Sequence, residues 1–598
     1  AGQYTQKASS VAIGFNAANN QQATRSVAIG VDSGRTLQTA SCVSIGDTSA
    51  YDTQGTKSVA IGFSSGKYKQ GVGSGAGTGS AIAIGNNAGL GTTLIGQGTN
   101  AIAIGTDAGS VAQGTDTIAI GGGAGNATQA TLCVAIGKEA GNTTQGTNSV
   151  AIGNTSGKYN QGKGTGSGTG GAIAIGNGAG VGSTLVGQDS NAIAIGSGAG
   201  ATVQGASIAI GLNAGATSQS GQSIAIGELS GNLNQGSSCV AIGNQAGNNG
   251  QIQGAIAIGY QSGKNTQGAD SVAIGPSTGV TSQATLCVAI GKEAGNTTQG
   301  TKSIAIGNTA GKYNQGIGAS GGTGGAIAIG NGAGLGTTLI GQNTNAIAIG
   351  TDAGSVAQGF NNVALGFGAG KTRQTEDAIS IGTDAGSADQ GTSGIAIGHF
   401  TARTSQSNDS IAVGTYAGDA NQGGTCIAIG FGSGQYKQGK GSGSGTGNAI
   451  AIGNGAGTGT TLVGQNSDAI AIGTSSGVTA QGSQAIALGV GSGNNNQGQF
   501  SIGVGSGAGQ TLQDTHSVAL GYHTGYTSQS TYCIAIGDIA GETSQGTNSI
   551  AIGNTAGRYK QGTGSSGGTG GAIAIGNGAG TGTTLVGQNT NAIAIGTS

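Results

Sequence analysis

The sequence predicts an all-β fold, a single elongated parallel β-solenoid with about 16 residues per coil. Two observations predict it. A motif of aliphatic, small, aliphatic and Gly, such as Val27-Ala28-Ile29-Gly30, occurs 34 times, and 22 of the 33 intervals between motif glycines are 16 residues long. A glutamine follows most motif glycines by eight residues. A fixed period of this size is typical of a solenoid, whose repeats bury their apolar residues only against their neighbours.

The composition indicates one continuous domain, because no stretch within residues 1–598 breaks the repeat or carries a different mixture of residues. Only 7% of the residues are charged, the formal net charge is -1, and Pro occurs once among 134 glycines. The chain therefore lacks the basic surface that binds nucleic acid or an anionic membrane. It also lacks an apolar run long enough for membrane insertion and the proline-rich triplets of collagen.

Each motif predicts a short strand, since its aliphatic residues are bounded by glycines. A helix is disfavoured, because each glycine in a helix interior costs about 1 kcal/mol. We expect two short strands per coil, joined by glycine turns. Side chains alternate along a strand, so the two aliphatic residues share one face and the central Ala lies on the other. We expect the aliphatic rows to fill the interior of the coil.

The central position of the motif decides the expected oligomer face. It holds Ala in 31 motifs, with Ser44, Ser380 and Gly503 as the exceptions. A solvent-facing position would vary and carry charge, so we expect this face to pack against other copies of the chain. Association remains the expectation if the two faces are interchanged, because neither suits water. The predicted oligomer face includes Ala28, Ala60, Ala83, Ala103, Ala119 and Ala135.

The six cysteines occupy one position, just before the first aliphatic residue of a motif, where other coils have Ser or Ala. No two lie in adjacent coils, which excludes vertical disulfides and a four-cysteine metal site. We expect small buried thiols, with pairing across an oligomer axis as the alternative. These residues are Cys42, Cys133, Cys239, Cys287, Cys426 and Cys533.

The glutamine row predicts an amide ladder, in which each side chain bonds to the copies above and below at a coil spacing of ~4.8 Å. A buried amide must have such partners. The alternative is a surface row of ligand-binding amides. The first members of the predicted ladder are Gln22, Gln38, Gln54, Gln70, Gln97, Gln113 and Gln129.

Two kinds of insertion always occur together, as glycine intervals of 23 and then 20 residues. The first coil of each pair has a basic and Tyr tripeptide and a loop such as 71–80; the second has four extra residues, such as 92–95. Insertions on a solenoid mark the face where binding usually occurs, so we expect lateral or glycan contacts here. Glycine bulges without a partner are the alternative. The looped coil pairs lie near 62–105, 153–196, 307–350, 430–473 and 553–596, and their candidate contact residues are Tyr68, Tyr159, Tyr313, Tyr436 and Tyr559.

The sequence offers no constellation for catalysis. His399, His516 and His523 are scattered, without the Ser and Asp partners of a triad. We therefore expect no enzyme activity, cofactor or metal. The chain begins without Met or a signal-peptide pattern. The repeat would continue in phase from Ser598 to Ala1, which predicts either end-to-end stacking or a window of a longer array.

The string Ser-Val-Ala-Ile-Gly, followed by Ala-Gly or Ser-Gly, resembles the head repeats of trimeric autotransporter adhesins, the YadA-like heads. The resemblance covers the whole chain and implies a left-handed β-roll, three chains around an axis and an exposed structural or adhesive role. The period of 16 is longer than that family's, and the glutamine is not part of its pattern. Similar tracts also look like repetitive structural proteins of large DNA viruses and phages.

These features predict a non-enzymatic structural protein, a fibre of associated β-solenoids at a cell surface, a virion surface or otherwise outside the cell. The expected partners are copies of the chain, as a trimer with end-to-end stacking, and glycans. The alternative functions are an adhesin or glycan-binding module and an ice-binding solenoid that uses its flat Ala face.

Overall fold

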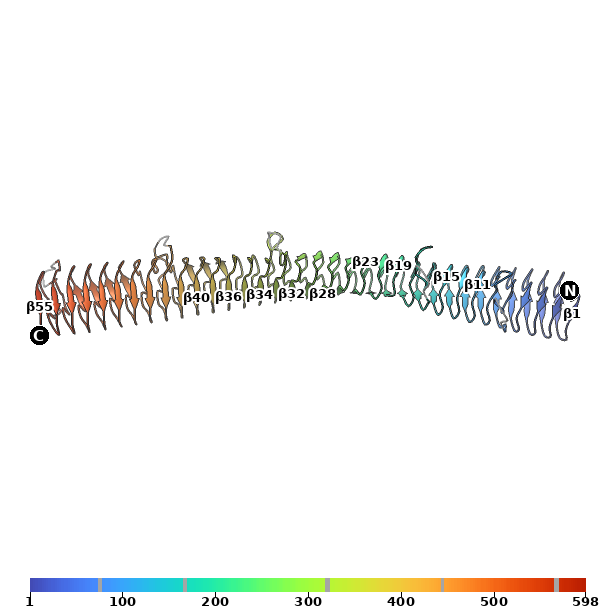
Figure 1. Ribbon diagram of the computed structural model, residues 1–598, viewed down its shortest axis with the longest axis horizontal. Coiled ribbons are helices and arrows are strands. Elements are labelled where there is room, and N and C mark those ends of the chain that lie inside the picture. The colour runs from blue at the N-terminus through green and yellow to red at the C-terminus, as the bar shows by residue number, and fades with distance from the viewer. Residues whose placement is uncertain (74–77, 165–168, 318–322, 443–445, 564–568) are drawn as a thin grey trace. The chain divides into compact units, whose positions relative to one another are not determined.

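The computed structural model describes residues 1–73, 78–164, 169–317, 323–442, 446–563 and 569–598. These residues form short β-strands and no helix, and each strand pairs in parallel with the strand of the next coil. The predicted parallel β-solenoid is therefore confirmed. The chain divides into two compact units, Ala1–Asn296 and Thr297–Ser598. Within each unit the coils stack in sequence order (Figure 1).

One wall of every coil, which we call the aliphatic wall, consists of the three-residue strands of the motif. In the first unit these strands are β2 (Val11–Ile13), β4 (Val27–Ile29), β6 (Val43–Ile45), β8 (Val59–Ile61), β9 (Ile82–Ile84), β10 (Ile102–Ile104), β12 (Ile118–Ile120), β14 (Val134–Ile136), β16 (Val150–Ile152), β17 (Ile173–Ile175), β18 (Ile193–Ile195), β20 (Ile208–Ile210), β22 (Ile224–Ile226), β24 (Val240–Ile242), β26 (Ile256–Ile258), β28 (Val272–Ile274) and β30 (Val288–Ile290).

The aliphatic wall of the second unit has the same construction. Its strands are β32 (Ile304–Ile306), β33 (Ile327–Ile329), β34 (Ile347–Ile349), β35 (Val363–Leu365), β36 (Ile379–Ile381), β38 (Ile395–Ile397), β40 (Ile411–Val413), β42 (Ile427–Ile429), β43 (Ile450–Ile452), β44 (Ile470–Ile472), β45 (Ile486–Leu488), β47 (Ile502–Val504), β49 (Val518–Leu520), β51 (Ile534–Ile536), β53 (Ile550–Ile552), β54 (Ile573–Ile575) and β55 (Ile593–Ile595).

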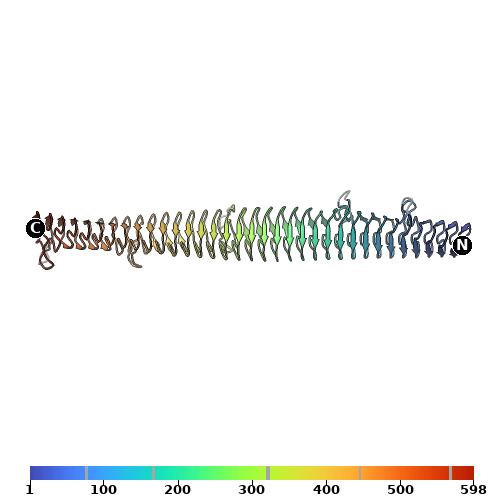
Figure 2. The same cartoon turned by 90° about the horizontal axis from the view of Figure 1, so that it is seen from below.

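The register of the aliphatic wall is the same at every step within a unit. Between β4 and β6, Val27 pairs with Val43 and Ile29 with Ile45. The insertions do not disturb it: β8 pairs with β9 across a 23-residue interval, with Val59 opposite Ile82. Figure 2 shows the arrows of successive coils side by side. Equivalent residues thus form continuous rows along each unit.

The other wall, which we call the glutamine wall, has strands of two or three residues that end on the repeated glutamine. They are β1 (Thr5–Gln6), β3 (Gln21–Gln22), β5 (Leu37–Gln38), β7 (Thr53–Gln54), β11 (Ala112–Gln113), β13 (Thr128–Gln129), β15 (Thr144–Gln145), β19 (Val203–Gln204), β21 (Ser218–Gln219), β23 (Leu233–Gln235), β25 (Asn249–Gln251), β27 (Thr266–Gln267) and β29 (Ser282–Gln283) in the first unit, and β31 (Thr298–Gln299), β37 (Ala388–Gln390), β39 (Thr404–Gln406), β41 (Ala420–Gln422), β46 (Asn495–Gln497), β48 (Thr511–Gln513), β50 (Thr527–Gln529) and β52 (Thr543–Gln545) in the second.

The glutamine wall is interrupted where the aliphatic wall is not. It forms separate sheets such as β1-β3-β5-β7 and β11-β13-β15, and the looped coils lie between these two. At such coils only isolated bridges remain, as between Gln54 and Gln70. The insertions therefore lie directly before or after the short strands of the glutamine wall, and not in the aliphatic wall.

The motif glycine makes the corner after each aliphatic strand. Gly137 has a φ of +129°, and a Cβ there would lie 2.5 Å from the carbonyl oxygen of Gly153 in the next coil. Only glycine fits both the backbone conformation and the close approach. This explains why the motif ends on Gly in all 34 copies.

Candidate functional site: the outer aliphatic stripe and the looped coils

The structure reverses the predicted faces of the aliphatic wall. The proposed oligomer-face residues are completely buried inside the coil of their own chain, so no partner can reach them. The exposed fraction is 0% for each of Ala28, Ala60, Ala83, Ala103, Ala119 and Ala135. The aliphatic residues on either side point outward instead, as the half-buried Val27 and Ile29 do. An ice-binding role for an exposed Ala face is excluded for the same reason.

The coil is too narrow for aliphatic side chains because the glutamines already cross it. Gln38 on β5 donates from Nε2 to the carbonyl oxygen of Val27 on β4, at 2.9 Å. The two walls are thus one glutamine side chain apart, and only a small residue fits opposite. A second row of small residues at the corner, such as Ala88 and Ala108, packs against the strand alanines Ala83 and Ala103.

The predicted glutamine ladder is present inside the coil. Each of the seven named glutamines is at most 2% exposed. Nε2 of Gln22 donates to Oε1 of Gln38 at 2.9 Å, and Gln38 donates in the same way to Gln54 at 3.0 Å. The ladder is not continuous: Oε1 of Gln97 and of Gln129 accept no hydrogen bond within the described part of the chain. The glutamines are structural, so they do not offer a surface row of ligand-binding amides.

The cysteines are also interior residues, and all six are 0% exposed and free. Disulfides across an oligomer axis are therefore excluded in this fold. Sγ of Cys533 donates to the carbonyl oxygen of Gly546 at 2.9 Å, as the hydroxyl of Ser410 does to Gly423 at 2.6 Å. Burial raises the pKa of Cys533 to about 11. Ser and Cys thus fill the same role in this row.

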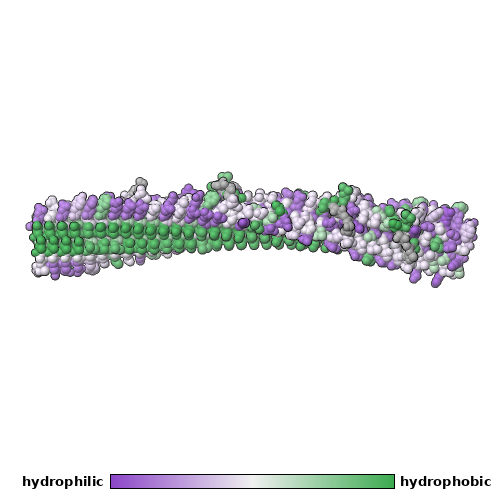
Figure 3. Space-filling view, viewed as in Figure 1, coloured by the Kyte–Doolittle hydropathy of each residue, from purple (hydrophilic) through white to green (hydrophobic). Residues whose placement is uncertain are grey.

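The outward aliphatic residues form an apolar surface along each unit, which we call the stripe. It consists of the first and third residues of the aliphatic-wall strands. The third residue is 36% exposed in Ile61 and Ile152 and 42% in Leu488. In the second unit the stripe appears as two adjacent green rows (Figure 3). The looped coils do not interrupt it, since their strands keep the register.

Each looped coil pair is one structural unit. In the first pair the loop of the first coil is tied to the second coil, because Thr99 Oγ1 donates to the carbonyl oxygen of Gly71 at 3.2 Å. Lys69 of the first coil donates from Nζ to the carbonyl oxygen of Leu94 in the four-residue insertion, at 3.2 Å. This mutual bracing explains why the two insertions always occur together. Residues 74–77 of the predicted contact loop, and their counterparts in the other loops, lie outside the described residues.

The candidate tyrosines are half-buried rather than projecting. Four of the five lie beside the basic residue that precedes them, as in Lys67, whose Nζ is 5.4 Å from the ring centroid of Tyr68. Leucines project furthest in these coils, and sequence reasoning did not single them out. Their identical position in every insertion is the signal that could have found them. The exposed fractions are 76% for Leu94, 82% for Leu185, 80% for Leu339, 75% for Leu462 and 77% for Leu585.

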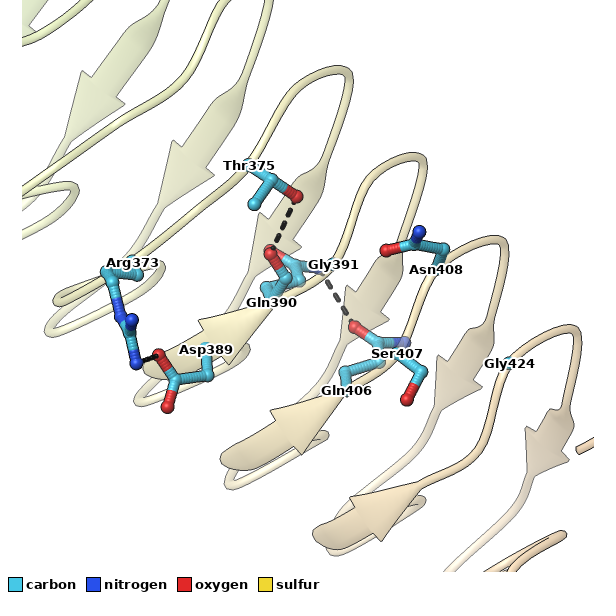
Figure 4. Close-up of a pocket in the computed structure, with 9 residues that line it drawn as sticks. All are labelled: Arg373, Thr375, Asp389, Gln390, Gly391, Gln406, Ser407, Asn408 and Gly424. Carbon is cyan, nitrogen blue, oxygen red and sulfur yellow. Dashed lines mark hydrogen bonds and ion pairs between the residues drawn. The ribbon is translucent and has the colours of Figure 1, made fainter. Parts of the chain in front are cut away.

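A shallow groove of about 520 Å³ runs over the glutamine wall of the second unit (Figure 4). Its polar lining includes Thr375 and Asn408. An ion pair at its edge joins Arg373 and Asp389, with a nitrogen-oxygen distance of 2.5 Å. The groove spans several coils, so a ligand in it would be extended along the stack.

Within the described residues no three His, Cys, Asp or Glu side chains gather closely enough to hold a metal ion. The three histidines lie in aromatic contacts: His516, for example, stacks on Tyr532 with centroids 4.9 Å apart. Nor does the described chain contain a helix that is long and apolar enough to span a membrane.

The fold and these surfaces define the chain as a β-solenoid repeat protein. No protein-family model matches it, and comparison with curated proteins gives no match.

Proposed function

We propose that the chain is a non-enzymatic structural protein, whose copies associate side by side through the stripe to build a fibre. The observation that supports this best is the unbroken register of the stripe within each unit. Insertions are placed only in the glutamine wall, while every looped coil keeps its two outward aliphatic residues in line. Exposure to water alone would not require a surface to be so regular and so apolar.

The size of the stripe supports the same proposal. Full burial of an Ile contributes about 3 kcal/mol at ~25 cal/mol per Å², which corresponds to roughly 120 Å² per side chain. Where about a third of this is exposed, as in Ile61 and Ile152, 17 such residues, one for each aliphatic-wall strand of a unit, would present at most roughly 700 Å². The largest apolar patch of a typical monomer is about 300–600 Å², and a stable interface buries about 800 Å² per partner. The first residues of the strands add further area.

The resemblance to trimeric adhesin heads supports three copies around an axis and a site of action outside the cell or on a virion. The mass of the particles would measure the number of copies.

The test replaces five outward stripe residues, all 36–39% exposed, with lysine. A long Lys side chain reaches water from an isolated stripe but cannot be buried between two copies. The stripe variant carries Ile61→Lys, Ile152→Lys, Ile290→Lys, Ile429→Lys and Ile552→Lys. Its matched control adds the same charge at residues that are 38–58% exposed outside the stripe, as Val31→Lys, Val111→Lys, Leu212→Lys, Val356→Lys and Val490→Lys.

Analytical ultracentrifugation should show an oligomer for the original chain and for the control, and a monomer for the stripe variant. Circular dichroism should be the same for all three. A monomeric original chain, or equal masses for the two variants, would refute association through the stripe.

An adhesin or glycan-binding module is the second candidate, and the groove of Figure 4 supports it. Its lining carries the side-chain polar groups of Arg373, Thr375 and Asn408, which can form hydrogen bonds with sugar hydroxyls. A glycan array would test this candidate. Arg373→Ala with Asn408→Ala should abolish any signal that the groove produces, whereas the stripe variant should retain it.

A further inference from the structure

The corner that follows β12 lacks side chains at two positions where the neighbouring coils carry them. Gly121 is the only one of the 34 motif glycines that is followed by two further glycines, Gly122 and Gly123. A Cβ at Gly122 would meet no atom within 4 Å. The three glycines therefore leave a notch in the surface of the first unit, one coil high.

The notch has a volume of about 530 Å³, within the range of small-molecule sites. It lies between the coil before β12 and the coil after it, which are two steps of ~4.8 Å apart. Its lining contains two carboxylates, an ammonium group, two amides and a hydroxyl. These groups belong to Asp107 and Glu139, to Lys138, to Asn126 and Asn142, and to Thr106.

Contacts between coils hold the polar groups of the notch in place. Nδ2 of Asn87 donates to Oδ1 of Asp107 at 3.0 Å. Nζ of Lys158 lies 2.6 Å from Oε2 of Glu139, in an ion pair. Asn142 donates from Nδ2 to a carbonyl oxygen of the preceding coil at 2.9 Å. Groups that are already positioned lose little freedom when a ligand binds.

The charges around the notch cancel, because the two carboxylates Asp107 and Glu139 are matched by the two ammonium groups of Lys138 and Lys158. Hydrogen bonding from Lys158 lowers the pKa of Glu139, so this carboxylate is ionised at neutral pH. A site without net charge does not favour an anion or a cation overall. Carboxylates need donors and an ammonium group needs acceptors, so a ligand of this site offers both.

We propose that the notch binds one sugar ring of a neutral glycan. A hydroxyl group both donates and accepts hydrogen bonds, so neighbouring hydroxyls of one ring can serve a carboxylate and the ammonium group of Lys138. The ring occupies the space beside Gly122 that side chains fill in other coils. This site lies in the first unit and shares no residue with the groove of Figure 4 or with the stripe. It therefore adds a ligand to the proposed fibre and does not depend on association.

The test titrates the whole chain with the methyl glycosides of glucose, galactose and mannose and follows binding by saturation-transfer NMR. Gly122→Leu fills the notch with a side chain that this position accepts, since Leu212 follows its motif glycine in the same way. The matched control, Ser197→Leu, adds the same side chain at the equivalent position of another coil in the first unit. Circular dichroism should be the same for both variants and the original chain.

We expect at least one glycoside to bind the original chain and the Ser197→Leu control with a Kd on the order of 1 mM, and we expect Gly122→Leu to lose this binding. Asp107→Asn should weaken binding about tenfold, because a carboxylate accepts a stronger hydrogen bond than an amide does. Asp32→Asn, at the equivalent position of another coil, should leave binding unchanged.

Binding that survives in Gly122→Leu, or that is lost equally in Ser197→Leu, would overturn the site. An original chain that binds none of the three glycosides would also overturn it, even if that chain bound sulfate or ammonium ions. The lysine stripe variant and the variant with Arg373→Ala and Asn408→Ala should keep the binding, because neither changes the notch. Loss of binding in either would place the glycan outside the notch, whereas the mass of the particles tests the stripe separately.

Discussion

At the residue scale, hydrogen bonds between buried polar side chains of neighbouring coils hold the interior together, with gaps such as those at Oε1 of Gln97 and Gln129. The residues that replace Ala in its row show that a polar group in the interior has hydrogen-bond partners. Ser380 replaces Ala, and its Oγ donates to Oε1 of Gln390 at 2.6 Å and accepts from Nε2 of Gln374 at 3.0 Å. A hydroxyl is thus admitted where it has hydrogen-bond partners, and Ser44 likewise donates to the carbonyl oxygen of Ser49 at 2.8 Å. An unpaired polar group there would cost about 1–3 kcal/mol.

Gln145→Leu should open its coil locally. Gln145 accepts a hydrogen bond from Gln129 at 3.1 Å and donates to Gln161 at 3.0 Å. Leucine would leave both neighbours without that bond, at a cost of roughly 1–3 kcal/mol each. Native-state hydrogen exchange should show faster exchange in coils 129–161. Thr144→Val, an outward residue of the same strand, is the control, and equal exchange in the two variants would contradict a structural ladder.

The buried thiols predict a loss of stability at alkaline pH. Burial raises the pKa of Cys426 and Cys533 to about 11 in the folded chain. In the unfolded chain a thiol ionises near its ordinary pKa of about 8.5. Between these two values the folded state binds more protons, so stability is full below about pH 8.5 and falls as the pH rises toward 11.

Cys426→Ser with Cys533→Ser should reduce this fall, by roughly 1–3 kcal/mol per thiol at most. Denaturant unfolding followed by circular dichroism, at about pH 8 and pH 10.5, measures the difference between the variant and the original chain. Lysines and tyrosines also titrate in this range, but they are common to both proteins. The same pH dependence in both would rule out the thiols as its cause.

At the element scale, the sequence predicts the strands, the period, the ladder and the paired insertions, but it does not orient the aliphatic wall. Alternation divides Val27, Ala28 and Ile29 between two faces without saying which face is inside. The expectation that larger apolar residues fill the core fails because Gln38 occupies the narrow interior. The glutamine row indicates which face is inside, because a buried side chain of that length leaves space only for Ala on the opposite wall.

The corner between the walls depends on the motif glycine. Gly137→Ala would place a Cβ 2.5 Å from the carbonyl oxygen of Gly153 at a φ of +129°. Backbone strain and overpacking each cost about 1–3 kcal/mol, so this coil should lose at least ~2 kcal/mol. Gly122→Ala is the control, because a Cβ at Gly122 meets no atom within 4 Å. Hydrogen exchange across residues 121–153 measures both, and similar protection in both would contradict the corner's role.

At the scale of the whole molecule, apolar contacts between copies and a nearly neutral surface predict how assembly responds to temperature and salt. The formal net charge is -1, and only 7% of the residues are charged. The stripe contains no charged group. Assembly should therefore follow the physics of apolar burial rather than of ion pairs.

Apolar association weakens on cooling, because its driving force near room temperature is largely entropic. Salt screens charges strongly, but it has little to screen on these surfaces. Sedimentation should therefore show more dissociated chain at about 4 °C than at 25 °C, and little change between about 0.05 M and 0.5 M NaCl. Dissociation caused by salt, with no effect of temperature, would assign the assembly to charged residues such as Arg373 and Asp389. That outcome would refute the stripe even if the chain proved oligomeric, because a surface made of Ile, Val and Leu has no charge to screen.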